Sequence, residues 1–317
     1  MNLSLFEPSP PAFACQLGEK LRALASQKIY LGTSSWKYEG WLGQIYSAEK
    51  YVVRGRFSRQ KFEAECLREY AETFPAVCGD FSFYQFPSPA YWQRLFDSAP
   101  GSLWFAFKVP EEITVKRFPR HDRYGARAGQ PNPSFLNTHL LIDFLLRPLE
   151  PYRGRIAALI LEFGAFPASS FAGEAPFFEQ LELFLETLPR EFRYAVEVRN
   201  PEFLVRDYFE CLRRHNVAHV FNAWTRMPEL SVQLSLPGAF TTDFTLVRAL
   251  LRKGRSYEEA VRRFEPYNQV QDPNPEVRQA LRQLIERAKR SAQPAFIFVN
   301  NRLEGNAPST IAAIING

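Results

Sequence analysis

The chain has 317 residues, which is long enough for one α/β barrel with some added segments. Its 46% hydrophobic and 23% charged residues exclude a disordered chain. Its longest apolar runs, such as residues 156–161, are far shorter than the roughly 20 residues that cross a bilayer, so we expect no contact with a membrane. The formal net charge of +5 is mild, but basic residues gather in one stretch near residue 120.

The first 27 residues lie outside the pattern that follows them. A proline-rich piece precedes a short predicted helix, residues 14–26, which either closes the bottom of the main domain or packs outside it. The start of the chain lacks the basic-then-apolar order of a secretory signal, so we expect a cytoplasmic protein. We therefore divide the chain into an N-terminal extension, residues 1–27, and one domain, residues 28–317.

From residue 28 onward, short apolar runs alternate with segments of helical periodicity. Predicted helices cover residues 60–74, residues 134–146 with Ser134 as the N-cap, a segment that Pro176 begins, and residues 275–289. The predicted strands are residues 28–32, 77–83, 104–109, 157–163, 194–198, 217–222, 244–248 and 295–300.

Continuously apolar strands that alternate with helices predict an α/β fold with a parallel sheet, and an even number of such units favours closure into a (β/α)8 TIM-type barrel. A doubly wound open sheet is the alternative. It usually carries a glycine-rich phosphate loop, G-x-G-x-x-G or G-x-x-x-x-G-K-[ST], and neither motif follows any predicted strand. The barrel places functional side chains at the C-terminal ends of its strands.

The loop after the first predicted strand reads TSSWKYEGW from Thr33. Thr33 and Ser34 offer hydroxyl groups, and Trp36 and Trp41 offer flat faces on which a small polar ligand could stack. The alternative is that both tryptophans only pack the rim of the barrel. Both interpretations stay open at this point.

Two charged residues on the fifth predicted strand, Glu197 and Arg199, are two positions apart and therefore point to the same side. They either satisfy each other as a buried ion pair or present the guanidinium to a carboxylate or phosphate ligand. Glu162, at the end of the neighbouring strand, could join Glu197 in a carboxylate pair with separated pKa values. Glu197 and Glu162 are thus the predicted catalytic residues.

Other strand ends add further polar candidates. Lys108 closes the third strand, and Tyr84 follows the second strand just beyond Asp80. Asn300 and Asn301 leave the eighth strand, where amides either orient a sugar or base or simply shape a turn. We include Tyr84, Lys108, Asn300 and Asn301 among the predicted ligand-binding residues.

The long third loop, residues 115–133, combines basic and aromatic side chains. This composition suits a lid over an anion, a solvated surface loop, or a surface that binds a nucleic-acid strand. The basic members of this loop are Lys116, Arg117, Arg120, Arg123 and Arg127.

Several kinds of site lack their signature in this sequence. The four cysteines form no C-x-x-C pair, the four histidines show no H-E-x-x-H, and no G-x-S-x-G elbow occurs. We therefore predict reduced cysteines, no metal site and no cofactor.

Five segments together resemble the domain of unknown function 72 family, the YecE-like barrels. They are GTSSW with Trp41 and Tyr46, FSFYQFPS from Phe81, FKVPEEIT from Phe107, AVEVRNPEF from Ala195 and FVNNRLEGNAP from Phe298. The resemblance implies a TIM-type barrel with a polar pocket at the strand ends and no settled activity. The pocket positions that it implies are Thr33, Ser34, Trp36, Trp41, Tyr84, Glu197, Arg199, Asn300 and Asn301.

The chain departs from the pattern of that family at Cys78, Asp80, Glu162 and Val115, and around residues 244–257. We expect an enzyme that acts on a small, hydroxylated, anionic ligand, such as a phosphorylated sugar or nucleotide fragment, held by Arg199, Lys108 and the tryptophans. The alternative is a non-catalytic protein that binds nucleic acid through residues 115–133. A glycoside hydrolase is less favoured, because the seventh strand carries no glutamate.

Overall fold

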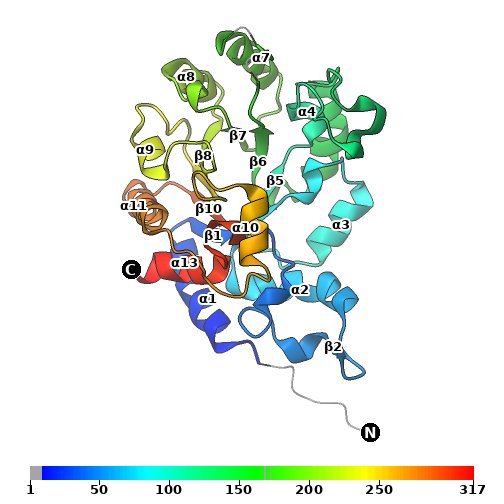
Figure 1. Ribbon diagram of the computed structural model, residues 1–317, viewed down its shortest axis with the longest axis vertical. Coiled ribbons are helices and arrows are strands. Elements are labelled where there is room, and N and C mark those ends of the chain that lie inside the picture. Colours follow the sequence, from blue (N-terminus) through cyan, green and yellow to red (C-terminus); the bar gives the residue numbers. More distant parts are fainter. Residues whose placement is uncertain (1–8, 168, 172) are drawn as a thin grey trace.

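A computed structural model describes residues 9–167, 169–171 and 173–317. Eight parallel strands close into a barrel with helices around it, which confirms the predicted (β/α)8 TIM-type fold (Figure 1). No helix in the described part of the chain is both long and apolar enough to cross a membrane. The barrel strands are β1 (Ile29–Thr33), β4 (Ala76–Gly79), β5 (Trp104–Lys108), β6 (Ile156–Phe163), β7 (Tyr194–Val198), β8 (Ala218–Ala223), β9 (Thr245–Ala249) and β10 (Ala295–Val299).

The remaining strands and helices lie between or outside these eight strands. A small hairpin pairs β2 (Val52–Val53) with β3 (Arg56–Phe57). The helices are α1 (Ala12–Ala25), α2 (Arg59–Thr73), α3 (Pro89–Asp97), α4 (Glu111–Thr114), α5 (Thr138–Leu141), α6 (Arg147–Leu149), α7 (Ala175–Glu186), α8 (Arg206–Arg214), α9 (Leu230–Ser235), α10 (Tyr257–Phe264), α11 (Pro275–Ser291), α12 (Asn301–Glu304) and α13 (Ala307–Asn316).

Local hydrogen bonds explain where several helices begin. The side chains of Ser58 and Asn274 accept hydrogen bonds from the backbone of α2 and α11, as N-caps do. Ser134 was a wrong prediction for such a cap, because α5 begins later and Asn137 accepts the hydrogen bond from the Leu140 N–H. A π-helical segment, Ile142–Leu146, then continues α5.

The second barrel strand is shorter than the predicted residues 77–83. It ends at Gly79, and a 3-10 turn, Phe81–Phe83, follows it. The turn directs the Phe81 ring against Trp92 and Phe107 in the layer between barrel and helices. Apolar character alone could not separate these two segments, because the aromatic residues of the turn are as hydrophobic as a strand.

The interior of the barrel differs between its two ends. Strand alternation points Tyr30, Trp104 and Phe296 inward at the N-terminal end, where their rings contact one another. Small and branched side chains such as Ala106, Ala195 and Val220 fill the middle. The last inward positions at the C-terminal end are charged or amide residues: Lys108, Glu162, Glu197, Asn222 and Arg248.

The N-terminal helix packs outside the barrel. Its buried residues, which include Leu17 and Leu21, belong to the apolar layer between the strands and the surrounding helices. α1 lies against α2 and β1, and Arg22 donates a hydrogen bond to the Glu72 carbonyl of α2. Of the two alternatives for this helix, packing outside the barrel is therefore the one observed.

Candidate functional site

Six charged side chains meet at the C-terminal mouth of the barrel. They are three cations, Lys108, Arg199 and Arg248, and three carboxylates, Asp80, Glu162 and Glu197. We call this group the mouth cluster. Because the charges balance in number, burial in the barrel leaves no net charge to be neutralised by a ligand.

Arg248 lies at the centre of the mouth cluster. Its guanidinium contacts Glu162 and Glu197, and its Nη2 lies 3.5 Å from Asp80 Oδ1. The Lys108 ammonium lies 3.1 Å from Glu162 and 3.3 Å from Asp80. The network thus spans the barrel interior from β9 to β4 and β5.

Electrostatics favour the charged forms of Glu162 and Lys108. Burial opposes the charge of Glu162, but Lys108, Arg199 and Arg248 outweigh it and hold the pKa of Glu162 well below the usual value. Burial likewise opposes the charge of Lys108, but Glu162 and Asp80 outweigh it and raise the pKa of the ammonium. Glu162 is therefore a carboxylate at neutral pH and has no proton to donate as an acid.

Glu197 and Arg199 form the ion pair that their spacing allowed, with 2.7 Å between Arg199 Nη2 and Glu197 Oε1. Glu197 is fully buried, whereas the side chain of Glu162 keeps 14% of its surface exposed. The two glutamates are register neighbours on β6 and β7, and both contact Arg248. Glu162 is thus the more accessible carboxylate of the predicted pair.

The residues after β1 divide between the inside and the outside of the barrel. Thr33 points outward, where its hydroxyl lies 2.9 Å from Tyr70 Oη. Ser34 points inward, and its buried hydroxyl has no hydrogen-bond partner. Trp41 is fully buried between Tyr38 and Tyr46, and Trp36 is 5% exposed with its ring against Phe81. Both tryptophans pack with neighbouring rings, as the rim interpretation expects.

The remaining predicted residues surround the mouth in different ways. Tyr84 is 59% exposed, and the guanidinium of Arg123 lies over its ring. Asn300 caps α12 by accepting a hydrogen bond from the Arg302 N–H. Asn301 accepts one from the Ala307 N–H, and its own amide nitrogen is buried without a partner. The two asparagines therefore shape the turn after β10.

Sequence reasoning missed Arg248, Asn222 and Trp224. Arg248 closed the predicted seventh strand but was given no role, although it holds the same last inward position as Lys108 and Glu162. Asn222 is fully buried, with its Oδ1 unpartnered. The Arg199 guanidinium lies 3.9 Å from the centroid of the Trp224 ring. Inspecting the last inward residue of every strand would have found the first two.

Beside the mouth cluster, the loops after β5 and β6 enclose a cavity of about 660 Å³. We call it the basic groove, because Lys116, Arg117 and Arg120 line it and none of its described lining residues is acidic. Phe118 and Phe166 supply aromatic surface. Arg117 donates a hydrogen bond to the Gly129 carbonyl, and the ammonium of Lys116 lies over the Phe171 ring.

The groove adjoins the mouth cluster through the backbone. Gly164, which lines the groove, follows Glu162 by two residues. Asn200, next to Arg199, accepts a hydrogen bond from the Phe166 N–H and donates one to the Phe166 carbonyl. The groove therefore lies at the C-terminal face, where barrel enzymes hold their ligands.

The other two basic residues of the third loop are paired. Arg123 forms an ion pair with Glu111, and Arg127 forms one with Glu112. These contacts fasten the loop to α4. Across the loop, the Phe118 N–H donates to the Gln130 carbonyl, and the Gly129 N–H donates to the Phe118 carbonyl. No ion pair with a carboxylate is seen for Lys116, Arg117 or Arg120 in the described part of the chain.

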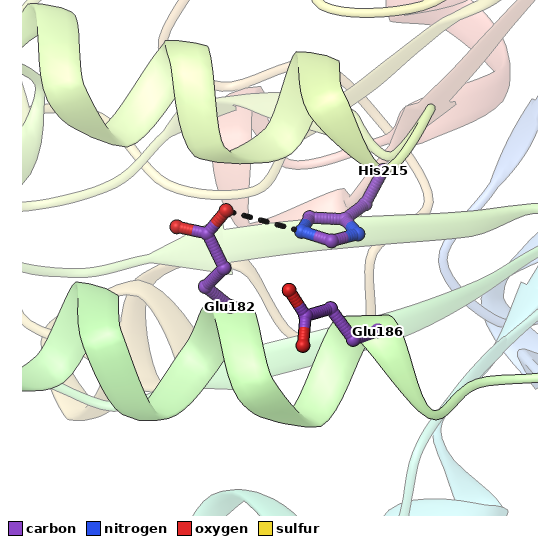
Figure 2. A group of neighbouring side chains, drawn as sticks. All are labelled: Glu182, Glu186 and His215. Atoms are coloured by element: carbon purple, nitrogen blue, oxygen red, sulfur yellow. Dashed lines mark hydrogen bonds and ion pairs between the residues drawn. The ribbon is translucent and has the colours of Figure 1, made fainter.

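Among the described residues, one group has the donor set of a metal site: Glu182, Glu186 and His215 (Figure 2). The three side chains belong to α7 and to the residue after α8, outside the barrel. They are therefore separate from the mouth cluster.

Comparison with known proteins gives a family and a fold. A family model described as "Protein of unknown function DUF72" matches residues 30–316. UPF0759 protein YecE of Escherichia coli K12, and that of strain O157:H7, are 28% identical over 178 residues, which cover 56% of this chain and 51% of each relative. The aligned region thus spans about half the length of these curated relatives.

Two solved structures share the fold. A DUF72 family protein from Thermotoga maritima aligns with a TM-score of 0.58 and 20% identity, covering 91% of this chain and 98% of that one. A DUF72 family protein from Enterococcus faecalis aligns with a TM-score of 0.57 and 14% identity, covering 91% and 96%.

Proposed function

This chain belongs to the DUF72 family of unknown function, and from that premise we propose that it is an enzyme acting on a small, hydroxylated ligand with an anionic group. In this proposal, the anionic group binds in the basic groove and the hydroxylated part reaches the mouth cluster. The ligand class is a phosphate-bearing sugar or a nucleotide-like molecule.

The observation that carries the proposal is the charge of the groove. Three cationic side chains line a cavity of about 660 Å³ whose described lining includes no carboxylate. Such a concentration of one charge sign in a concave site attracts an anion. A volume of this size lies within the range of pockets that hold small molecules.

The mouth cluster supplies the acid–base chemistry of the proposal. Glu162 acts as the general base, because it is charged at neutral pH and is partly exposed at the mouth. Glu197, held between Arg199 and Arg248, keeps the two guanidinium groups in place. Lys108 and Arg199 stabilise negative charge that develops on the reacting oxygen.

Calorimetric titration and thermal shift with phosphate compounds test the proposal. A panel of sugar phosphates and nucleotides should contain a ligand that raises the melting temperature, since a ligand that binds only the folded state stabilises it. The double variant Lys116→Gln, Arg120→Gln should weaken that binding at least about tenfold, by loss of charge-assisted hydrogen bonds. Arg206→Gln, which changes an exposed side chain of α8, is the control and should bind normally.

Glu162→Gln separates catalysis from binding once a ligand is found. It should retain the ligand and abolish turnover, because an amide cannot accept the proton. If no phosphate compound shifts the melting temperature, or if the groove variants bind as the parent does, the proposal is wrong.

The alternative function, binding of nucleic acid without catalysis, is supported by the same groove. Its cations alternate with Phe118 and Phe166, and bases of a single strand stack on such rings. Short single-stranded oligonucleotides distinguish the two proposals. Stabilisation by oligonucleotides alone, falling steeply between low and moderate salt, would favour this alternative.

A further inference from the structure

The second candidate site lies on the outside of the barrel, between α7 and α8. Glu182 and Glu186 are one helical turn apart on α7, and His215 directly follows α8. One ligand atom of each residue lies within 4.8 Å of the others. Figure 2 shows the two carboxylates and the imidazole converging on one point between the helices.

His215 is directed into this group by its surroundings. The residue is 8% exposed, and Arg190 donates a hydrogen bond to its backbone carbonyl. Its Nε2 lies 3.4 Å from Glu182 Oε1, and its Nδ1 has no hydrogen-bond partner. Within the described residues, the ring therefore has no polar partner outside the group, although it is buried.

The two glutamates place two like charges close together at the end of α7. Like charges four residues apart on a helix repel each other, and both glutamates lie in the C-terminal half of α7, toward the negative end of its dipole. Arg214 offsets the charge of Glu182 through hydrogen bonds of 2.7 and 2.5 Å. No such contact is seen for Glu186 among the described residues.

The Arg214 contact also prepares Glu182 as a ligand. Arg214 holds both oxygens of the Glu182 carboxylate, since its Nε donates to Oε1 and its Nη2 donates to Oε2. A carboxylate has about four lone-pair positions on its two oxygens, so an arginine and a metal ion can share it. Arg214 then orients the carboxylate in the way that partners of metal ligands do.

We propose that Glu182, Glu186 and His215 form a site for one zinc ion, with water as the fourth ligand. One imidazole nitrogen and two carboxylate oxygens are donors that zinc takes, at about 2.0–2.2 Å. Donor atoms around such an ion are about 3.4 Å apart, so the site closes by a movement of roughly 1 Å. Glu186 is exposed and free to make that movement.

The location assigns the ion a structural role. Glu186 ends α7 before β7, and His215 precedes β8 by three residues, so the site lies at the N-terminal face of the barrel. Residues at that face of a barrel serve stability, while chemistry takes place at the opposite face. The zinc ion joins the ends of α7 and α8, and its loss leaves the mouth cluster and the basic groove intact.

Metal titration of tag-free, chelator-treated protein tests the site. Calorimetry should show one equivalent of Zn²⁺ bound, and Co²⁺ in its place should give the visible absorption bands of a four-coordinate ion. Zn²⁺ should also raise the melting temperature. Glu186→Gln, which changes an exposed side chain, should lower the affinity at least tenfold without unfolding the protein. His215→Ala should abolish binding, with circular dichroism to establish that it folds.

Two matched controls lie nearby. Glu179→Gln changes another exposed glutamate of α7, and His139→Ala removes an exposed histidine elsewhere; both should bind Zn²⁺ as the parent does. Absence of Zn²⁺ binding by the parent, or equal binding by Glu186→Gln, overturns the inference. Because the groove lies at the other face, the phosphate titrations are unaffected by either result, and the two proposals fail independently.

Discussion

The two ends of the barrel interior are built from the same eight strands but from opposite kinds of side chain. At the N-terminal end, the Tyr30 and Phe296 rings stack with 5.0 Å between their centroids, and Trp104 lies tilted against Tyr30 and edge-on to Phe296. At the C-terminal end, three cations and three carboxylates occupy the equivalent inward positions. Aromatic rings fill the N-terminal end of the barrel interior by their size. Charged side chains can occupy the C-terminal end only if positive and negative charges neutralise each other.

That difference bears on the proposed function of the mouth. Apolar residues of similar volume often replace a buried ion network with no loss of stability, so a network of this size is not needed to close a barrel. The aromatic end already does so without charge. Under the proposed function, the mouth cluster serves chemistry at the mouth and not the stability of the fold.

The largest effect is expected at the aromatic end. Phe296→Ala should lower the free energy of unfolding by about 3–5 kcal/mol, because it leaves a cavity among rings that cannot close over it. Urea unfolding at pH 7 measures the loss. Ligand binding by the folded variant should be unchanged; a selective loss of binding would contradict the separation between the two ends.

A smaller effect with a clear pH dependence is expected for Glu162→Gln. At pH 7, we expect a loss on the order of 2–3 kcal/mol, because three cations lose one of their carboxylates while two remain. The folded pKa of Glu162 lies below its unfolded value of about 4.3, so its contribution is complete above that pH and is lost as the pH falls. The stability difference between parent and variant should therefore shrink as the pH falls below about 4.3 and vanish only below the folded pKa of Glu162.

Unfolding measured from pH 7 to pH 3 checks this convergence. Glu179→Gln, an exposed site on α7, should follow the parent at every pH. A difference between Glu162→Gln and the parent that stays constant down to pH 3 would mean that the carboxylate charge is not what stabilises the cluster.

The smallest effect compares two adjacent residues after β1. Thr33→Val should cost about 1–2 kcal/mol, because the outward hydroxyl bonds Tyr70 and the Ser35 carbonyl. Ser34→Ala should cost close to nothing, because the inward hydroxyl has no partner. Thermal unfolding of both variants measures the difference. A larger loss for Ser34→Ala would show that the inward hydroxyl stabilises the fold after all.

Much of the fold was predictable, because the apolar runs and helical periods are local properties of the chain. All eight barrel strands were expected close to their observed positions. The errors lie where local rules compete: Asn137 caps α5 in place of Ser134, and the aromatic turn after Gly79 was taken for strand.

The candidate site was predictable only in part. The two-residue spacing of Glu197 and Arg199 indicated that both side chains face the same side of the strand, and the observed ion pair agrees with this. Arg248 was missed because no charged residue lies two positions from it, as Glu197 does from Arg199. Its partners are Asp80, which follows β4, and the glutamates of β6 and β7. One wall of the basic groove was predicted, because its cations belong to the basic loop of residues 115–133. The other wall, formed by the loop after β6, was not predicted.

The sequence by itself determined the order of the elements, the inward alternation along each strand and the basic character of one loop, because each depends on residues only a few positions apart. Only the tertiary structure decided which charges meet. Arg248 reaches Asp80 and Glu162 across the barrel, and His215 reaches α7 from the end of α8. Ion pairing depends on distances of 3–4 Å between side chains, and barrel closure sets those distances between strands far apart in the chain.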